Sequence, residues 1–133
     1  MNRVVNLLGR GLIALPFVPA GIAKFATPGP FLEHMAAHGV PGVLLQLVGV
    51  FEVIAGLSIL TGLFSRYSAA ALGLFCVAIA AIFHLNFADH ADRTLFLKDL
   101  AIAGGLFALA TSWPISRYLD DATPTGVQPA MPC

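Results

Sequence analysis

The most marked shortage in this sequence is charge. Charged residues make up 11% of its 133 residues, against about 25% in an ordinary soluble domain. Seven Lys and Arg balance seven Asp and Glu, which excludes a basic nucleic-acid binder, so no nucleic-acid partner is expected. Hydrophobic residues make up 58%, and this excludes a disordered chain, because disorder needs low hydrophobicity and high net charge.

The sequence also lacks the motifs of several common chemistries. Cys76 and Cys133 are its two cysteines and form no C-x-x-C pair, which disfavours thiol–disulfide catalysis. No phosphate-binding glycine loop, haem attachment motif or H-E-x-x-H zinc motif is present. His34 and His38 have a metal-compatible helical spacing. Because no fixed metal signature accompanies them, we predict no metal site and assign these histidines no role.

What the chain does contain is four long apolar segments. They cover about residues 4–25, 43–64, 67–87 and 95–113, and a helix needs about 20 apolar residues to cross a membrane. None of them alternates as a barrel strand does, and a backbone in lipid must satisfy its hydrogen bonds internally. The sequence therefore predicts an all-α fold: an integral membrane antiparallel four-helix bundle over residues 1–113, with a flexible cytoplasmic tail over 114–133.

The segments between the predicted spans indicate a short additional helix and the orientation of the protein in the membrane. Residues 26–42 carry turn residues at both ends around a stretch with Phe31 and Met35 on one helical side. We expect a short interfacial helix there, between the first two spans. Arg3, Arg66 and Arg117 fall on the side that holds both termini. The positive-inside rule therefore predicts that both termini are cytoplasmic.

Ionisable residues inside or at the ends of the spans are the main functional signal. A charge near mid-membrane costs about 2.5–3.5 kcal/mol on insertion scales, so it usually faces a partner or a cavity. We predict that such residues from different helices line an outward-facing polar pocket that binds a ligand, and that His84 and Glu52 can exchange protons there. The predicted ligand-binding residues are Lys24, Glu52, His84, Lys98 and Asp99.

Glu52 lies in mid-span and has two candidate partners. Helical side chains lean toward the N-terminus of their helix, so Lys24 and Glu52 converge from neighbouring antiparallel helices, and Lys24 is the preferred partner. Arg10 is the second, in a structural Arg10–Glu52 ion pair. Gly49 and Gly56 share the face of Glu52, and small residues there allow close helix contact.

The alternative to a ligand pocket is that each charge has its own structural role. Lysines near helix ends reach the headgroups with their tips, and an interior histidine is more often hydrogen-bonded than a ligand. The protein would then be a structural or assembly subunit without a ligand. A small-solute transporter is a third alternative, and with four spans and no internal repeat it would need an oligomer.

Several short stretches resemble the DoxX family in order and spacing, over about residues 3 to 112. Members commonly carry Asn after the lysine of the last stretch, so Asp99 is a departure. The stretches are Gly9-Arg10-Gly11, Gly21-Ile22-Ala23-Lys24-Phe25, His38-Gly39-Val40-Pro41, Glu52-Val53-Ile54-Ala55-Gly56, Gly62-Leu63-Phe64-Ser65-Arg66, Phe83-His84 and Phe96-Leu97-Lys98-Asp99 with the small residues that follow.

This resemblance implies a multi-pass protein of the bacterial inner membrane. The family name is linked to a thiosulfate:quinone oxidoreductase, so the resemblance implies an association with membrane redox complexes and a quinone as candidate cofactor. It assigns no reaction and no catalytic residue, because likeness of fold does not establish chemistry. We therefore predict an accessory, redox-associated protein that binds a quinone-like or other amphipathic ligand. Its expected partners are membrane lipid, redox-complex subunits and further copies of itself.

Overall fold

The computed structural model describes residues 2–122, with side chains described from Arg3 to Ser112. Between residues 2 and 122 the chain forms helices and no strand, which confirms the all-α prediction. The helices are α1 (Asn2–Ala14), α2 (Phe17–Ala26), α3 (Pro28–Ala37), α4 (Leu44–Thr61), α5 (Ser65–Phe83) and α6 (His90–Ala122).

Four stretches of these helices are long and apolar enough to cross a membrane. They are Arg3–Ala26, Leu44–Thr61, Ser65–Phe83 and His90–Ser112, which equal the predicted spans in number and lie close to the predicted ranges. The first is broken between α1 and α2 at Leu15 and Pro16, because proline lacks the N–H that an unbroken helix would need there. The short helix predicted between the first two spans is present as α3.

The ends of the last two spans differ from the prediction. Helix α5 ends at Phe83 rather than Phe87, and α6 begins at His90 rather than Leu95. The Asp89 carboxylate accepts a hydrogen bond of 2.9 Å from the Ala91 backbone N–H, and this capping starts α6 early. Helix α6 then continues past Pro114 to Ala122, into the expected tail. The rest of that tail, 123–133, lies outside the described residues.

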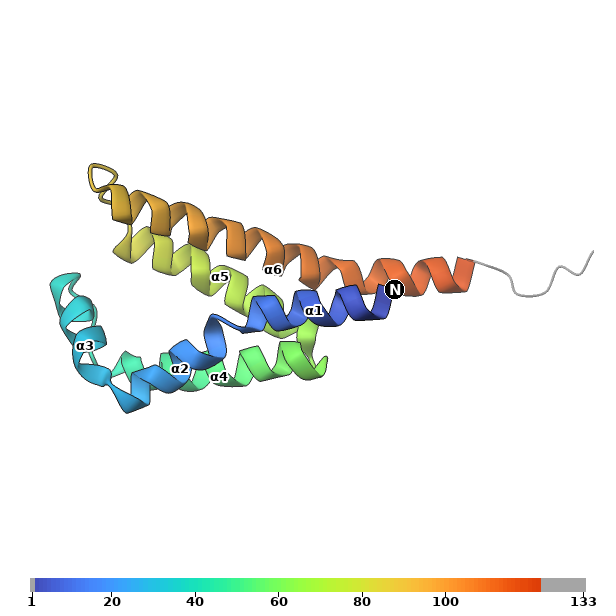
Figure 1. Cartoon of the computed structure of the whole chain (residues 1–133), viewed down its shortest axis with the longest axis horizontal. Helices are drawn as coiled ribbons and strands as arrows, with labels where there is room; N and C mark the ends of the chain where they lie inside the picture. The colour runs from blue at the N-terminus through green and yellow to red at the C-terminus, as the bar shows by residue number, and fades with distance from the viewer. Residues whose placement is uncertain (1, 123–133) are drawn as a thin grey trace, which may run out of the picture.

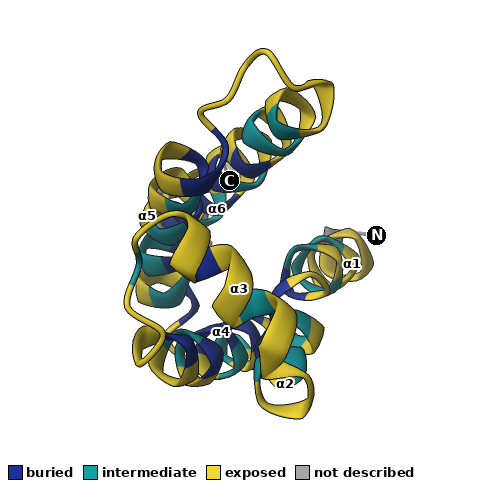
Figure 2. Cartoon of the chain, turned by 90° about the vertical axis from the view of Figure 1, so that its left-hand side faces the viewer, coloured by how far each residue is buried: buried dark blue, intermediate teal, exposed yellow. Residues whose placement is uncertain are grey.

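The helices pack as two pairs. Helix α5 lies beside α6 along most of its own length, and α2 lies along α4 (Figure 1). A short turn joins α4 to α5, with Gly62 at φ 83° and Phe64 at φ 51°. Within the described chain, no Cα atom of α2 comes within 8 Å of α5 or α6. The two pairs therefore meet through α4 and α5, while α2 stands apart from α5 and α6. Helix α3 lies over one end of this arrangement (Figure 2).

The core lies where α5 packs between α4 and α6, toward the turn between α4 and α5. Its largest fully buried side chains are Ile59, Leu72 and Leu106, surrounded by alanines such as Ala69 and Ala103. Small residues let membrane helices approach closely. Many large apolar side chains stay exposed on the outer surfaces of the helices, as expected for a chain whose solvent is lipid.

Two glycines set the distance between α2 and α4. A Cβ on Gly21 would lie 2.6 Å from Val53 Cγ2 and 2.8 Å from the backbone oxygen of Gly49. A Cβ on Gly49 would lie 2.9 Å from the Phe25 ring. The predicted close contact at Gly49 is therefore present. It brings Lys24, one helical turn after Gly21, against Glu52 on α4.

We expect Gly21→Ala to destabilise the protein, because the added methyl meets a backbone atom and overpacking costs about 1–3 kcal/mol. Gly104→Ala is the matched control, since nothing lies within 4 Å of a Cβ at Gly104 and alanine is the better helix former. Denaturant-induced loss of helical circular dichroism in detergent micelles measures both. Equal unfolding free energies for the two variants would contradict the close contact.

Candidate functional site

A cavity of about 450 Å³ lies between the two helix pairs. Every residue that the sequence predicted as ligand-binding lines it: Lys24, Glu52, His84, Lys98 and Asp99. The structure thus brings together side chains from α2, α4 and α6 and from the end of α5. The rest of the lining is mostly apolar and aromatic, including Phe17, Phe31, Met35, Leu45, Phe75, Ile79 and Ile102.

Lys24 and Glu52 form a buried ion pair across α2 and α4. Lys24 Nζ donates to Glu52 Oε2 at 2.5 Å, and the two side chains are only 11% and 6% exposed. Nζ also lies 3.5 Å from the backbone oxygen of Ala20 and 5.0 Å from the centre of the Phe31 ring, which attracts a cation through its π-face. The preferred partner predicted for Glu52 is therefore confirmed.

The structure separates Arg10 from Glu52. Arg10 Nη1 lies 2.7 Å from the place of a Cβ on Gly62, just after the end of α4. Gly62 is ten residues beyond Glu52, or about 15 Å along a helix. The alternative pair Arg10–Glu52 is therefore not formed. The Arg10 side chain leans toward the start of α1, and the C-terminus of α4, whose dipole favours a cation, lies there.

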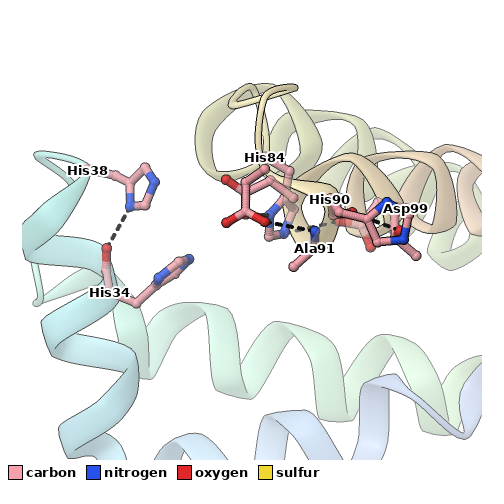
Figure 3. A network of polar contacts seen from close by, with 9 residues as sticks. His34, His38, His84, His90, Ala91 and Asp99 are labelled. Carbon is pink, nitrogen blue, oxygen red and sulfur yellow. Dashed lines mark hydrogen bonds and ion pairs between the residues drawn. The ribbon is translucent and has the colours of Figure 1, made fainter.

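His84 faces two carboxylates of α6, and Figure 3 shows it together with Asp99 and the histidines His34, His38 and His90. It is the first residue after α5, and its backbone N–H donates to the Ala80 oxygen at 3.1 Å. Its Nδ1 lies 3.7 Å from Asp92 Oδ1, and its Nε2 lies 3.7 Å from Asp99 Oδ2. The predicted site did not include Asp92, although it precedes Asp99 by seven residues, which is about two helical turns and places both on one face.

Helix α3 and its C-cap place two imidazoles near this end of the pocket: His34, which lines the pocket, and His38, the first residue after α3. The His34 ring stacks on Phe83 at 5.0 Å, and the His38 ring meets Phe83 edge-on at 5.0 Å. The His34 and His84 rings are 6.4 Å apart. His38 Nδ1 donates to the His34 backbone oxygen at 2.9 Å. The i, i+4 spacing was the one sequence signal that placed these two histidines on a common side.

The electrostatics of this cluster favour a neutral His34. Partial burial lowers the pKa of His34 from 6.5, and the nearby His38 and His84 lower it further, while Asp92 acts in the opposite direction. The ring therefore packs on Phe83 mainly in its uncharged form above that pH. Arg93 and His90 pair with each other at 2.9 Å on the exposed first turn of α6.

Lys98, Asp99 and Cys76 also line the cavity, and they differ in exposure. Lys98 lines the cavity and remains exposed, whereas Asp99 beside it is 9% exposed. Cys76 is buried and also lines the cavity. Among residues with described side chains, no group of three His, Cys, Asp or Glu is placed to hold a metal ion.

Comparisons with known proteins give two matches. A family model described as DoxX matches residues 5–85, so the helices up to α5 and His84 fall within it. The inner membrane protein YqjF of Escherichia coli (strain K12) is 36% identical over 120 residues, which is 90% of this chain and 92% of that relative. No solved structure matches the chain.

Lys24→Met should lower the free energy of unfolding by about 3 kcal/mol, because it leaves the Glu52 carboxylate buried without its cation. Lys24→Met combined with Glu52→Gln should lose less, since no unpaired buried charge remains. The matched control is Lys98→Met at an exposed lysine, where the change should stay within about 0.5 kcal/mol. Denaturant titration in micelles measures all three, and a double variant less stable than Lys24→Met would refute the pairing.

Acidification should loosen the contact of α3 with Phe83. Since the folded-state pKa of His34 is below its ordinary 6.5, its contribution to stability is complete above that value. The contribution is lost as the pH falls from 6.5 through the lower folded-state pKa. Thermal unfolding at stepped pH should show this loss, and His34→Gln should reduce it. An identical pH dependence in His34→Gln would show that His34 has no part in it.

Proposed function

The chain belongs to the DoxX family, and from that premise we propose that it binds an amphipathic, quinone-like ligand in the bacterial inner membrane. The observation that carries this proposal is the convergence of Lys24, Glu52, His84 and Asp99 on one mostly apolar cavity. Ionisable side chains within membrane spans usually mark functional sites. Here they come from separate helices and meet in one place.

The size and lining of the cavity suit such a ligand. Its volume of about 450 Å³ falls within the range of about 300–1,000 Å³ for small-molecule sites. Lys24 Nζ and the N–H of the His84 ring can donate hydrogen bonds to carbonyl oxygens on a ligand headgroup. Phe31 and Phe75 offer aromatic faces to a flat ring, and the apolar lining suits an acyl or isoprenoid chain.

The cavity also suits entry from the bilayer. Because α2 and α6 do not approach within 8 Å at Cα level over the described chain, the two helix pairs are not closed against each other on that side. A ligand dissolved in the membrane could then enter laterally. Membrane lipid would be the natural competitor for the same space.

We place the protein as a multi-pass antiparallel helical bundle with both termini in the cytoplasm. The four spans and the name of the similar inner membrane protein YqjF support the membrane. The distribution of Arg3 and Arg66 supports the orientation. Helix α3 then lies at the outer interface, and the pocket opens on that side. In this position the protein would act as an accessory to a redox complex or as an oligomer.

One observation favours the second candidate, a structural or assembly subunit with no ligand. Lys24 and Glu52 already satisfy each other at 2.5 Å, and a buried pair of this kind can serve to fix helix register. On this alternative the cavity would hold only lipid chains. The two candidate functions differ in which molecule remains bound when the protein is extracted from the membrane with detergent.

The test is a mass-spectrometric inventory of small molecules retained by the full chain in mild detergent. We expect a quinone or another polar-headed amphiphile to co-purify, and Glu52→Gln to reduce its amount at least tenfold with helical circular dichroism unchanged. Glu33→Gln is the matched control, because Glu33 is exposed and does not line the cavity. If wild type retains no such molecule and Glu52→Gln only unfolds the protein, the structural subunit is the correct function.

A further inference from the structure

The His84 imidazole has an unusual combination of burial and poor hydrogen bonding. His84 is 9% exposed, and its Nδ1 has no hydrogen-bond partner among the described residues. Buried polar atoms without a partner are rare, and each calls for an explanation. The ring faces a carboxylate on both sides, at 3.7 Å from Asp92 and 3.7 Å from Asp99.

A static ion pair does not account for this geometry. Charge-assisted hydrogen bonds close to about 2.7–2.9 Å, as the Lys24–Glu52 pair does at 2.5 Å. His84 closes on neither carboxylate. The ring stands midway, and a displacement of about 1 Å toward either side would make a hydrogen bond of normal length.

The two carboxylates also differ in exposure. Asp92 is in the first turn of α6 and its side chain is 26% exposed, whereas the Asp99 side chain is 13% exposed. Their separation of seven residues corresponds to about 10 Å along the helix axis. His84 therefore spans the interval between a carboxylate that water can reach and one in the wall of the cavity.

We propose that Asp92, His84 and Asp99 form a proton path between the aqueous end of α6 and the pocket. A proton on the Asp92 carboxyl passes to Nδ1 of the neutral ring, and the resulting imidazolium releases its Nε2 proton to the Asp99 carboxylate. One proton moves and no electrons do. The reverse transfer restores the first tautomer, so the path works in both directions.

Two further titratable side chains lie near the His84 ring and the carboxylates of this path. His34 is 6.4 Å from His84, and Lys98 adjoins Asp99 on α6. A histidine is suited to the task because its two nitrogens can take up and release protons near neutral pH. The proposal rests on the proposed function in one respect, since a ligand that gains or loses protons in the pocket would be its user.

The test is nitrogen NMR of the full chain labelled with ¹⁵N-histidine in micelles, with the His84 signals assigned by their loss in His84→Gln. In wild type we expect exchange between the two neutral tautomers of the ring, because either nitrogen can face a carboxylate. Asp92→Asn should leave the ring proton on Nε2, facing Asp99. Asp99→Asn should shift it to Nδ1, facing Asp92. Exchange broadening should be lost in both variants.

The control is His90→Gln, which removes an exposed histidine near the start of α6 and should leave the His84 signals unchanged. The same tautomer in both asparagine variants would overturn the proton path. So would a single fixed ring form without exchange in wild type, and that measurement decides the matter even if a variant fails to fold. Because no ligand is added, the result is independent of the co-purification experiment.

Discussion

The buried ion pair between Lys24 and Glu52 is the interaction on which the rest of the site depends. It forms because Gly21 and Gly49 let α2 and α4 approach until no room is left for a Cβ, and one turn later this brings the ammonium against the carboxylate. Two charges placed in lipid separately would each carry a large insertion cost. Joined, they hold α2 on α4 and form one polar wall of the cavity.

The opposite wall of the cavity, formed by α5 and α6, is held together without a buried charge pair. Helices α5 and α6 pack on each other through small and apolar residues such as Ala69, Leu72 and Leu106, so their association needs no buried charge pair. His84 and the carboxylates Asp92 and Asp99 stand at the end of this pair, beyond its core cluster. Because no Cα atom of α2 lies within 8 Å of α6 in the described chain, the width of the cavity follows from how α4 packs on α5.

The sequence predicted the elements well and their junctions less well. Four apolar segments and the lean of helical side chains sufficed to place the spans and to choose Lys24 for Glu52. The second choice, Arg10, failed because nothing in the sequence shows how α1 crosses the far end of α4. Asp92 was missed because α6 was expected to begin at Leu95, which left Asp92 in a loop. The early start depends on capping by Asp89, and the contact of α3 with Phe83 depends on a loop path that residue patterns do not specify.

The ionisable residues of the two polar walls have different roles: those of one wall are structural, and His84 in the other is available for chemistry. Lys24 and Glu52 are bonded at 2.5 Å, so freeing either one would expose a buried charge that the fold has already matched. His84 lies 3.7 Å from each of its carboxylates, and a proton or a ligand atom can engage it without breaking an existing hydrogen bond. A charge inside a membrane therefore has two distinct uses in this fold. The matched pair fixes the shape of the pocket, and the group left short of its partners is the one available for chemistry.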